Sequence, residues 1–275
     1  MASKTWFITG VSRGFGKALA DAVLAKGDIV VGTTRDGSVP FTDASGRLNV
    51  LSLDVTDAAM IPAVIKQAAE ITGQLDVVVN NAGYGLLGSI EEASEQEIDH
   101  LFDVNFHGTR RVVQAVLPYL RQQKSGHIVN ITSIAGLAPA AGSGFYAAAK
   151  FAVEGLSQSL AQEVAPLGIK VTLVEPGAFR TDFLSEHSIR IKPLAIQDYA
   201  ATAGAALAYL EAMSGTQAGD PARAADAIVR AVEASEPLLH LVLGPDAFRR
   251  TQEKRERFAA ELTRWKDVSL STDFE

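Results

Sequence analysis

The sequence predicts an α/β protein built on a doubly wound parallel sheet of seven strands, with helices on both faces. Short runs rich in Val, Ile and Leu alternate with longer stretches of helical periodicity, which is the pattern of a parallel sheet covered by helices. Each helical stretch between two strands is long enough to return the chain parallel to the strand before it. A glycine-rich turn joins the first strand to the first helix, where this class of fold places one.

Seven short apolar runs are expected to form the strands, at residues 5–9, 29–34, 48–53, 75–79, 127–132, 170–174 and 240–243. Helical periodicity is expected at residues 14–26, 57–72, 102–123, 144–165, 221–234 and 246–266. Residues 182–219 break the alternation, because they contain Ala- and Leu-rich helical pieces but no strand-like run. Since a chain of 275 residues with 47% apolar content can bury one large core, we expect a single domain of residues 1–275, with 182–219 as an inserted substrate lid.

Composition excludes several classes of partner. With 25 Lys and Arg against 32 Asp and Glu, the net charge of -7 repels phosphate backbones, so we expect no nucleic-acid partner. The chain has no cysteine, and its five histidines lack the spacing of metal ligands, so we expect no catalytic metal. No apolar run approaches the roughly 20 residues of a membrane span. The first apolar run begins at Thr5, which leaves no room for a leader, and we therefore expect a cytoplasmic protein with no membrane partner.

The glycine turn is a candidate phosphate site. Gly10, Gly14 and Gly16 let the backbone turn tightly and approach a ligand closely, and the following helix offers unpaired N–H groups and a favourable dipole. An ordinary strand-to-helix turn also favours glycine, so the motif by itself is compatible with no ligand at all. The residues of this turn that we expect to bind a dinucleotide are Gly10, Ser12, Arg13, Gly14, Phe15 and Gly16.

A tyrosine and a lysine form the candidate chemical centre. Tyr146 and Lys150 are four residues apart in a predicted helix, so their side chains share one face. A free phenol titrates near pKa ~10, and a nearby ammonium would lower that pKa towards a value suited to acid-base transfer. Ser133 follows the fifth predicted strand, and its hydroxyl would orient a substrate oxygen. Each residue alone is equally compatible with an ordinary structural role.

Together these segments resemble the short-chain dehydrogenase/reductase family, in its compact single-domain branch. The turn reads T-G-x-x-x-G-x-G, and Asn80 to Gly83 resembles the family's N-N-A-G signature. The resemblance implies a Rossmann-type sheet, a nicotinamide cofactor, and a catalytic set of Asn105, Ser133, Tyr146 and Lys150. The chain departs from the common Y-x-A-S-K form at Ala149, where many relatives carry a serine that is not a proton carrier, so we expect activity to be retained.

The resemblance also implies further cofactor contacts. Asp54 and Val55 match an adenine-contacting pair, and residues 176–181 match a P-G-x-x-x-T segment that meets the nicotinamide. Beyond the glycine turn, the expected cofactor-binding residues are Arg35, Asp54, Val55, Asn81, Ala82, Gly83, Tyr146, Lys150, Pro176, Gly177, Phe179 and Thr181.

Two arginines indicate the phosphorylated form of the cofactor. Relatives that prefer NAD usually carry an acidic residue at the position of Thr33, whereas Arg35 and Arg13 suit a 2′-phosphate. We therefore expect NADP(H) to be preferred over NAD(H). The alternative is that both arginines are solvated surface charges, with Asp36 weakening the local positive field.

The expected activity is interconversion of a carbonyl and a secondary alcohol, with a lipophilic small-molecule substrate. The segments expected to wall the substrate offer Leu86, Leu87, Leu137, Phe145, Phe179, Phe183 and Leu184. The family resemblance further implies a homodimer or homotetramer that pairs through the helices carrying Asn105 and Tyr146, where Phe151, Val153, Leu156 and Leu160 are apolar. The alternative function is an NADP(H)-binding regulator or scaffold without turnover, because fold alone does not guarantee chemistry.

Overall fold

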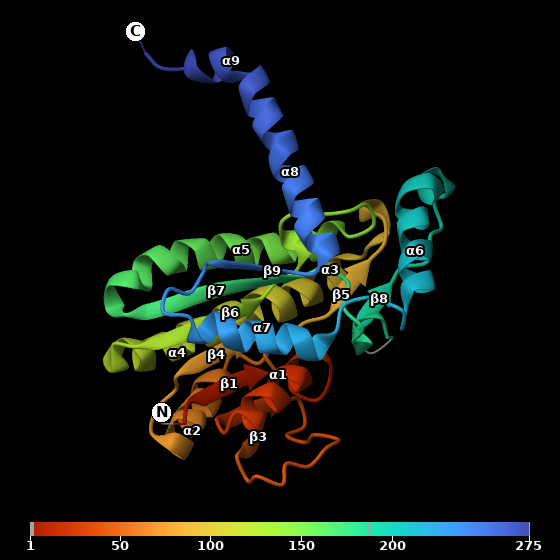
Figure 1. Cartoon of the computed structure of the whole chain (residues 1–275). Helices are drawn as coiled ribbons and strands as arrows, with labels where there is room; N and C mark the ends of the chain where they lie inside the picture. The colour runs from red at the N-terminus through yellow and green to blue at the C-terminus, as the bar shows by residue number, and fades with distance from the viewer. Residues whose placement is uncertain (1–2, 186–187, 275) are drawn as a thin grey trace.

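The computed structural model describes residues 3–185 and 188–274 and contains the expected sheet (Figure 1). Its seven strands pair in parallel in the order β3-β2-β1-β4-β6-β7-β9. The strand order reverses between β1 and β4, and sheets of this kind bind ligands at the carboxyl edge beside such a reversal. The predicted fold class, a doubly wound parallel α/β sheet, is confirmed.

The strands lie within two residues of their predicted ranges. They are β1 (Thr5–Thr9), β2 (Ile29–Thr34), β3 (Leu48–Ser52), β4 (Val77–Asn80), β6 (Gly126–Ile131), β7 (Ile169–Pro176) and β9 (His240–Leu243). β7 runs two residues further than predicted because its last residues pair with β9, up to Pro176 beside Leu243. The apolar runs in the sequence predict where the strands lie, but the residue at which a strand ends depends on its pairing with the neighbouring strand.

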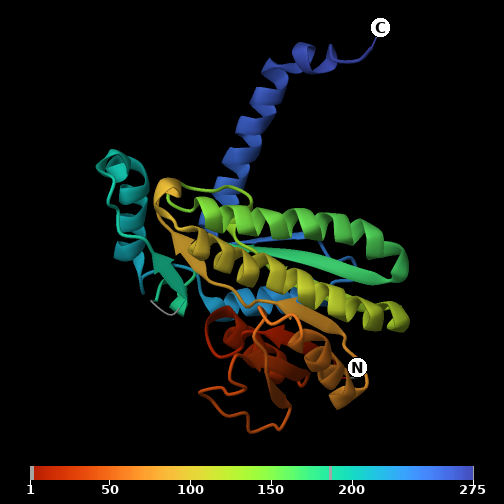
Figure 2. The same cartoon turned by 180° about the vertical axis from the view of Figure 1, so that it is seen from behind.

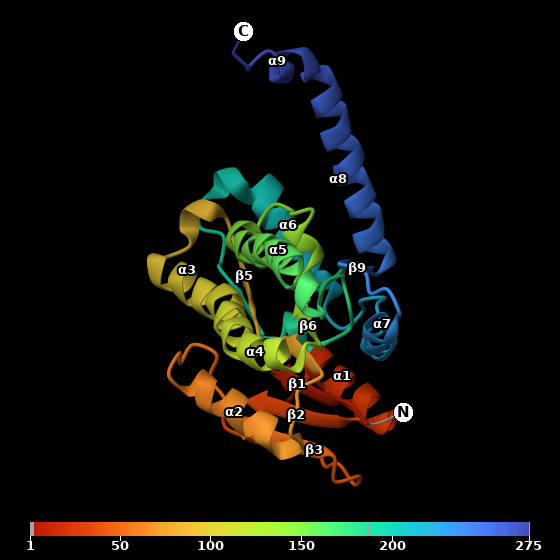
Figure 3. The same ribbon diagram turned by 90° about the vertical axis from the view of Figure 1, so that its left-hand side faces the viewer.

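Helices cover the sheet on both faces (Figure 3). One face carries α1 (Gly14–Ala25) and α7 (Pro221–Glu233), and the other carries α2 (Met60–Thr72), α4 (Thr109–Gln123) and α5 (Gly144–Val164). Viewed from behind, α4 and α5 run side by side across their face (Figure 2). Because successive strand residues point to opposite faces, Phe7 belongs to one core and its neighbours Trp6 and Ile8 belong to the other.

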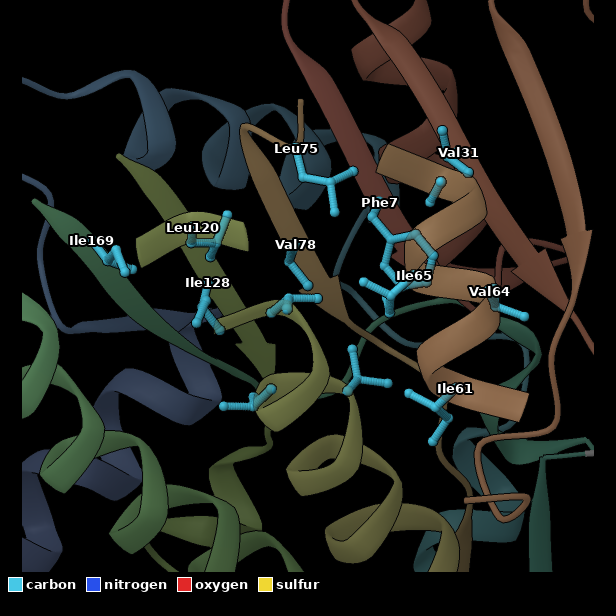
Figure 4. Close-up of a cluster of buried hydrophobic side chains, with 14 of the residues drawn as sticks. Phe7, Val31, Ile61, Val64, Ile65, Leu75, Val78, Leu120, Ile128 and Ile169 are labelled. Carbon is cyan, nitrogen blue, oxygen red and sulfur yellow. The ribbon is translucent and has the colours of Figure 1, made fainter. Parts of the chain in front are cut away.

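The larger core lies between the sheet and α2, α4 and α5. Figure 4 shows Phe7 of β1 next to Ile65 of α2, with Val78 and Leu75 nearby, and none of these four side chains exceeds 0% exposure. Burial of such side chains stabilises the fold by roughly 2 kcal/mol each relative to leaving them exposed. This packing fixes the strand ends from which the candidate site is built.

The helix predicted at residues 102–123 is wrong in detail. The chain forms α3 (Glu95–Phe102), then a wide π-helical turn (Asp103–Gly108), and only then α4. Ser94 and Glu97 form a capping box at the start of α3. This local signal in the sequence indicates a helix that begins before residue 102, where the apolar periodicity had placed its start. The widened turn matters because it contains Asn105.

The expectation of no strand within residues 182–219 is also wrong. The structure contains β8 (Ile189–Ile191), which pairs in parallel with β5 (Gly85–Leu87) in a separate two-stranded sheet. Three residues carry too little pattern to indicate a strand, and only the distant partner reveals it. The same stretch contains α6 (Ala205–Met213), and two of its residues, 186 and 187, lie outside the described residues.

Shorter helical elements complete the described chain. The short 3-10 turns are Ile90–Glu92, Ile134–Gly136, Ala165–Leu167, Asp182–Leu184 and Gln197–Tyr199, and a second π-helical turn is Ala200–Gly204.

Near the C-terminus, α8 (Pro245–Arg264) and α9 (Lys266–Leu270) project away from the sheet (Figures 1 and 3). The side chains of Phe258, Leu262 and Trp265 are more than half exposed on this arm. Among the described residues, no helix has the length and apolar character needed to cross a membrane.

Buried His127 makes stability depend on pH. Its Nε2 lies 2.9 Å from Oγ1 of Thr172, and burial, followed by the charges of Lys170 and Lys4, lowers its pKa to about 4. The unfolded chain binds a proton at this histidine near pH 6.5 and the folded chain does not, so the contribution of His127 to stability is complete well above pH 6.5 and is lost as pH drops towards 4. Between pH 7 and pH 5 this histidine should cost about 2 kcal/mol of the free energy of unfolding.

Urea unfolding at both pH values tests this expectation. His127→Gln should remove most of that extra loss, whereas His100→Gln, which alters an exposed histidine, should retain it. An equal pH-dependent loss in wild type and His127→Gln would contradict the assignment.

Candidate active site

The glycine turn between β1 and α1 adopts the conformation that its sequence predicts. Gly10 and Gly14 have φ of 74° and 58°, in the left-handed region that favours glycine. A Cβ on Gly16 would lie 2.1 Å from the carbonyl oxygen of Gly10, so this position has room for no side chain. The backbone of the turn therefore packs directly against the first residues of α1, with no side chain between them.

Asn81 ties this turn to the end of β4. Its Nδ2 donates to the carbonyl oxygens of Thr9 and Gly10, each at 2.9 Å. The backbone N–H groups of Asn81 and Ala82 both donate to Oγ1 of Thr9, at 2.9 and 3.0 Å. The structure thus brings the predicted N-N-A-G segment against the glycine turn, with Ala82 packed beside Gly10.

The predicted adenosine-side residues lie at the ends of β2 and β3. Arg35 is exposed, and Nε of Arg13 donates to Oγ of Ser188 at 3.2 Å. Burial raises the pKa of Asp54, but hydrogen bonds from Thr56 and the charge of Arg35 lower it overall. Val55, the other half of the predicted pair, packs against Gly108 instead of standing free.

Thr33 is 1% exposed, and its carbonyl oxygen accepts from the backbone N–H groups of Gly10 and Val11. The backbone of β2 is thereby joined directly to the glycine turn.

The segment after β7 approaches the glycine turn from the other side. Phe179 meets Phe15 edge to face, with ring centroids 5.1 Å apart, and Cβ of Thr181 lies 3.8 Å from the Cβ position of Gly14. Gly177, the residue after Pro176, packs closely against the side chain of Asp246. The carboxylate of Asp246 accepts from the N–H of Ala178 at 3.0 Å. Phe179 and Thr181 therefore lie beside the turn.

Tyr146, Lys150 and Ser133 come together at the start of α5. Nζ of Lys150 lies 5.8 Å from the ring centroid of Tyr146 and donates to the carbonyl oxygen of Ile131 at 2.9 Å. Ser133, two residues after β6, lies near enough to the phenol to lower its pKa, and its Oγ accepts from the N–H of Ala135 at 3.1 Å. The side chains of Tyr146 and Lys150 are 8% and 6% exposed.

Asn105 occupies the π-helical turn and reaches the same region through its neighbours. Its Nδ2 donates to the carbonyl oxygen of Tyr84 at 2.7 Å, and its Oδ1 accepts from the N–H of Tyr84 at 3.0 Å. Gly83 lies between Asn105 and Lys150, because a Cβ there would be 3.1 Å from Oδ1 of Asn105 and 3.7 Å from Nζ of Lys150. The four predicted catalytic residues therefore lie in one region, where Gly83 and Lys150 link Asn105 to Tyr146.

Burial has the largest effect on the pKa values of Tyr146 and Lys150. It raises the pKa of Tyr146 to about 12, against an opposing hydrogen bond from Ser133. This direction is opposite to the one predicted from the lysine charge alone. Burial lowers the pKa of Lys150 to about 8, and the charge of Glu154 opposes that shift.

Sequence reasoning missed Glu154 and Tyr84, whereas Phe183, which lies near Tyr146, was expected in the substrate wall. Glu154 is 2% exposed and lies one helical turn beyond Lys150, so the four-residue spacing that identified the tyrosine and lysine would also have found it. The rings of Phe183 and Tyr146 are tilted by 48° with centroids 5.8 Å apart, and the guanidinium of Arg190 lies 5.1 Å from the ring centroid of Tyr84. Both of these contacts join residues distant in sequence.

The predicted apolar wall is divided among several places. Leu86, Phe145 and Phe183 pack around Tyr146, and Leu87 and Leu184 pack with the inserted segment. Leu137 packs with Ala247 instead, and Phe179 lies at the glycine turn.

A surface hollow of about 580 Å³ lies beside the glycine turn, between α1 and α7. Its lining includes Gly14 and Thr181 from the predicted cofactor set, together with Arg180 and Lys17. The lining does not include the four predicted catalytic residues. The hollow therefore reaches the glycine-turn end of the expected cofactor site but not the predicted catalytic residues.

Comparison with known proteins identifies the family that these features suggest. The family model described as short chain dehydrogenase matches residues 4–191. Oxidoreductase BOA17 of Botryotinia fuckeliana is 39% identical over 98% of this chain and 99% of its own length. The 3-ketodihydrosphingosine reductase of Bacteroides thetaiotaomicron is 42% identical over 70% of each chain.

Solved structures agree with these matches. A short-chain dehydrogenase from Streptomyces avermitilis superposes with a TM-score of 0.90 at 40% identity, covering 99% of both chains. ElxO with NADP bound has a TM-score of 0.73 at 27% identity, covering 88% of this chain and 97% of its own.

The close packing at Gly16 leads to a stability prediction. Gly16→Ala should lower the free energy of unfolding by about 2 kcal/mol, because the methyl group would overlap the Gly10 carbonyl and Asn81. Gly155→Ala is the matched control, since Gly155 also lies in a helix but has no atom within 4 Å of its Cβ position. The control should be neutral or gain up to about 1 kcal/mol. Equal urea midpoints for Gly16→Ala and wild type would refute the packing argument.

Proposed function

The chain belongs to the short-chain dehydrogenase family, and from this membership we propose that it is an NADP(H)-dependent oxidoreductase that interconverts a carbonyl and a secondary alcohol. The observation that carries the proposal is the meeting of Tyr146, Lys150 and Ser133 in one buried cluster, with Asn105 joined to it through Gly83. A phenol, an ammonium and a hydroxyl arranged in this way suit proton transfer to a substrate oxygen.

The residues around the glycine turn fit a dinucleotide. Gly10 and Gly14 adopt positive φ, and Gly16 has no room for a side chain. The turn therefore presents backbone to a pyrophosphate at positions where side chains would block it. Pro176, Gly177, Phe179 and Thr181 would hold the nicotinamide end, and Asp54 with Val55 the adenine end. Bound nicotinamide supplies or accepts the hydride.

Tyr146 would act as the proton donor in carbonyl reduction. With a pKa raised by burial to about 12, the phenol is protonated at neutral pH and its proton is available to a developing alkoxide. Ser133, which lies close to the phenol, would share the substrate oxygen and orient it. The protonated phenol is the form that can donate to the substrate oxygen in carbonyl reduction.

Lys150 and Asn105 would support this transfer. The ammonium of Lys150 is held by the Ile131 carbonyl close to the tyrosine ring, where its charge stabilises a phenolate after proton transfer. Asn105 fixes the Tyr84 backbone with two hydrogen bonds, and this holds Gly83 against the lysine.

We infer a preference for NADP(H) from the charges at the end of β2. Arg35 is exposed beside the expected adenosine site, and Arg13 in the glycine turn adds a second guanidinium. Buried Thr33 offers no carboxylate to the ribose hydroxyls.

The substrate class proposed is a lipophilic ketone or alcohol. Leu86, Phe145 and Phe183 pack around Tyr146, and an apolar wall favours apolar substrate surface. The 3-ketodihydrosphingosine reductase named above acts, by its name, on a lipid ketone. Residues 182–219 would act as the lid of the single domain, because Phe183 brings this segment to the tyrosine.

We further propose a cytoplasmic homodimer or homotetramer. Phe151 on α5 is 44% exposed and remains available for pairing, whereas Val153 and Leu160 belong to the core. The exposed apolar residues of α8 extend the surface on which a second copy could pack.

A second candidate function is an NADP(H)-binding regulator without turnover. It predicts cofactor binding and no consumption of NADPH with any carbonyl.

Tyr146→Phe separates these functions. In the oxidoreductase the variant should lower kcat at least ~100-fold, because it loses the proton donor, while NADPH binding measured by fluorescence stays within a few-fold of wild type. The assay follows NADPH absorbance with hydrophobic ketones, aldehydes, quinones and charged keto acids. Tyr209→Phe, which removes a phenol from an exposed position, is the control and should be fully active. A kcat of Tyr146→Phe equal to that of wild type would refute the proposed role of the tyrosine.

Arg35→Glu tests the cofactor preference. The variant should lower the ratio of kcat/KM for NADPH to that for NADH by about 10-fold or more, since one charged hydrogen bond to the phosphate becomes a repulsion. Lys66→Glu makes the same charge change at an exposed site on α2 and should leave the ratio unchanged. An unaltered ratio in Arg35→Glu would count against a phosphate contact at this arginine.

A further inference from the structure

Three ligand-type side chains from separate elements meet behind the candidate active site. Glu154 of α5, Glu175 of β7 and His240 of β9 place one ligand atom each within 4.8 Å of the others. Nδ1 of His240 lies 2.7 Å from Oε1 of Glu175 and 3.8 Å from Oε2 of Glu154. Two ligand atoms of one tetrahedral metal, each at roughly 2.0–2.1 Å from it, lie roughly 3.3 Å apart, so small side-chain movements would produce that geometry.

The two carboxylates of this cluster are buried and incompletely paired. Glu154 is 2% and Glu175 is 0% exposed. Oε1 of Glu154 accepts from Oγ1 of Thr132 at 2.6 Å, but Oε2 of each glutamate has no hydrogen-bond partner in the part of the chain that the structure describes. A native fold rarely leaves two buried carboxylate oxygens without a donor or cation.

We propose that Glu154, Glu175 and His240 form a binding site for one divalent transition-metal cation of the Zn²⁺ or Mn²⁺ type. Two carboxylates and one imidazole supply the oxygen and nitrogen donors that these cations accept, and two carboxylates balance a double positive charge. Thr132 supplies an outer hydrogen bond that orients Glu154. The side chain of His240 is 39% exposed on edge strand β9, which gives an ion access from solvent.

The place of this site in the fold indicates a structural role. A cation there would join α5, β7 and β9 through one residue from each. It would lie beyond Lys150 as seen along α5, and would contribute no atom to the proton transfer proposed above. The expectation of no catalytic metal therefore remains a separate prediction.

Titration of the untagged full chain with metal ions tests the site. After removal of metals with a chelator, ZnCl₂ or MnCl₂ should bind at one ion per chain by calorimetry and should raise Tm, because the ion binds the folded state. His240→Gln and Glu175→Gln should each weaken this binding at least ~100-fold. His100→Gln, which removes an exposed histidine elsewhere, should bind like wild type.

Cobalt provides a second readout independent of stability. CoCl₂ should give a visible absorption spectrum of oxygen and nitrogen ligation in wild type that is lost in His240→Gln. If Glu175→Gln fails to fold, His240→Gln decides, because its side chain is partly exposed. Absence of saturable binding by wild type, or binding and a cobalt spectrum unchanged in His240→Gln, would overturn the proposal.

Discussion

The ammonium of Lys150 is almost completely buried, and the surrounding structure keeps that charge inside the protein. The end of β6 serves it twice, since Ile131 accepts from the ammonium and Thr132 donates to Glu154, the acidic residue one turn further along α5. A buried cation without such partners would cost several kcal/mol. Glu154, whose charge opposes the lowering of the Lys150 pKa, also lies beside Glu175 and His240, so the partner of the buried lysine belongs to the cluster behind it.

A second constraint acts at the centre of the sheet. Parallel strands β1 and β4 end side by side at the switch point, and Asn81 joins their ends by donating to two carbonyl oxygens of the glycine turn. These bonds fix the turn's backbone before any ligand is considered, and the absence of a side chain at Gly16 allows the close approach. The expected phosphate site and the tetrad residues consequently lie at the same sheet edge.

β5 and the segment that contains β8 form a small sheet of their own, separate from the seven-stranded sheet. β8 pairs with β5, and Phe183 packs against Tyr146, so the inserted segment is connected to the chemical centre through apolar contacts and one short ladder. Such small satellite packing permits change in this segment without disturbing the larger cores. β8 forms only through its pairing with β5, about 100 residues earlier in the chain, so the local sequence does not indicate it.

The sequence by itself determined the seven strands, the covering helices, the glycine turn and the four-residue spacing of Tyr146 and Lys150, because these depend on local periodicity and on backbone conformations available to glycine. Tertiary structure alone decided the π-helical turn at Asn105, the pairing of β8 and the raised pKa of Tyr146. It also brought Glu154, Glu175 and His240 together. Each of these depends on burial or on contact between residues distant along the chain, and neither leaves a periodic signal in the sequence.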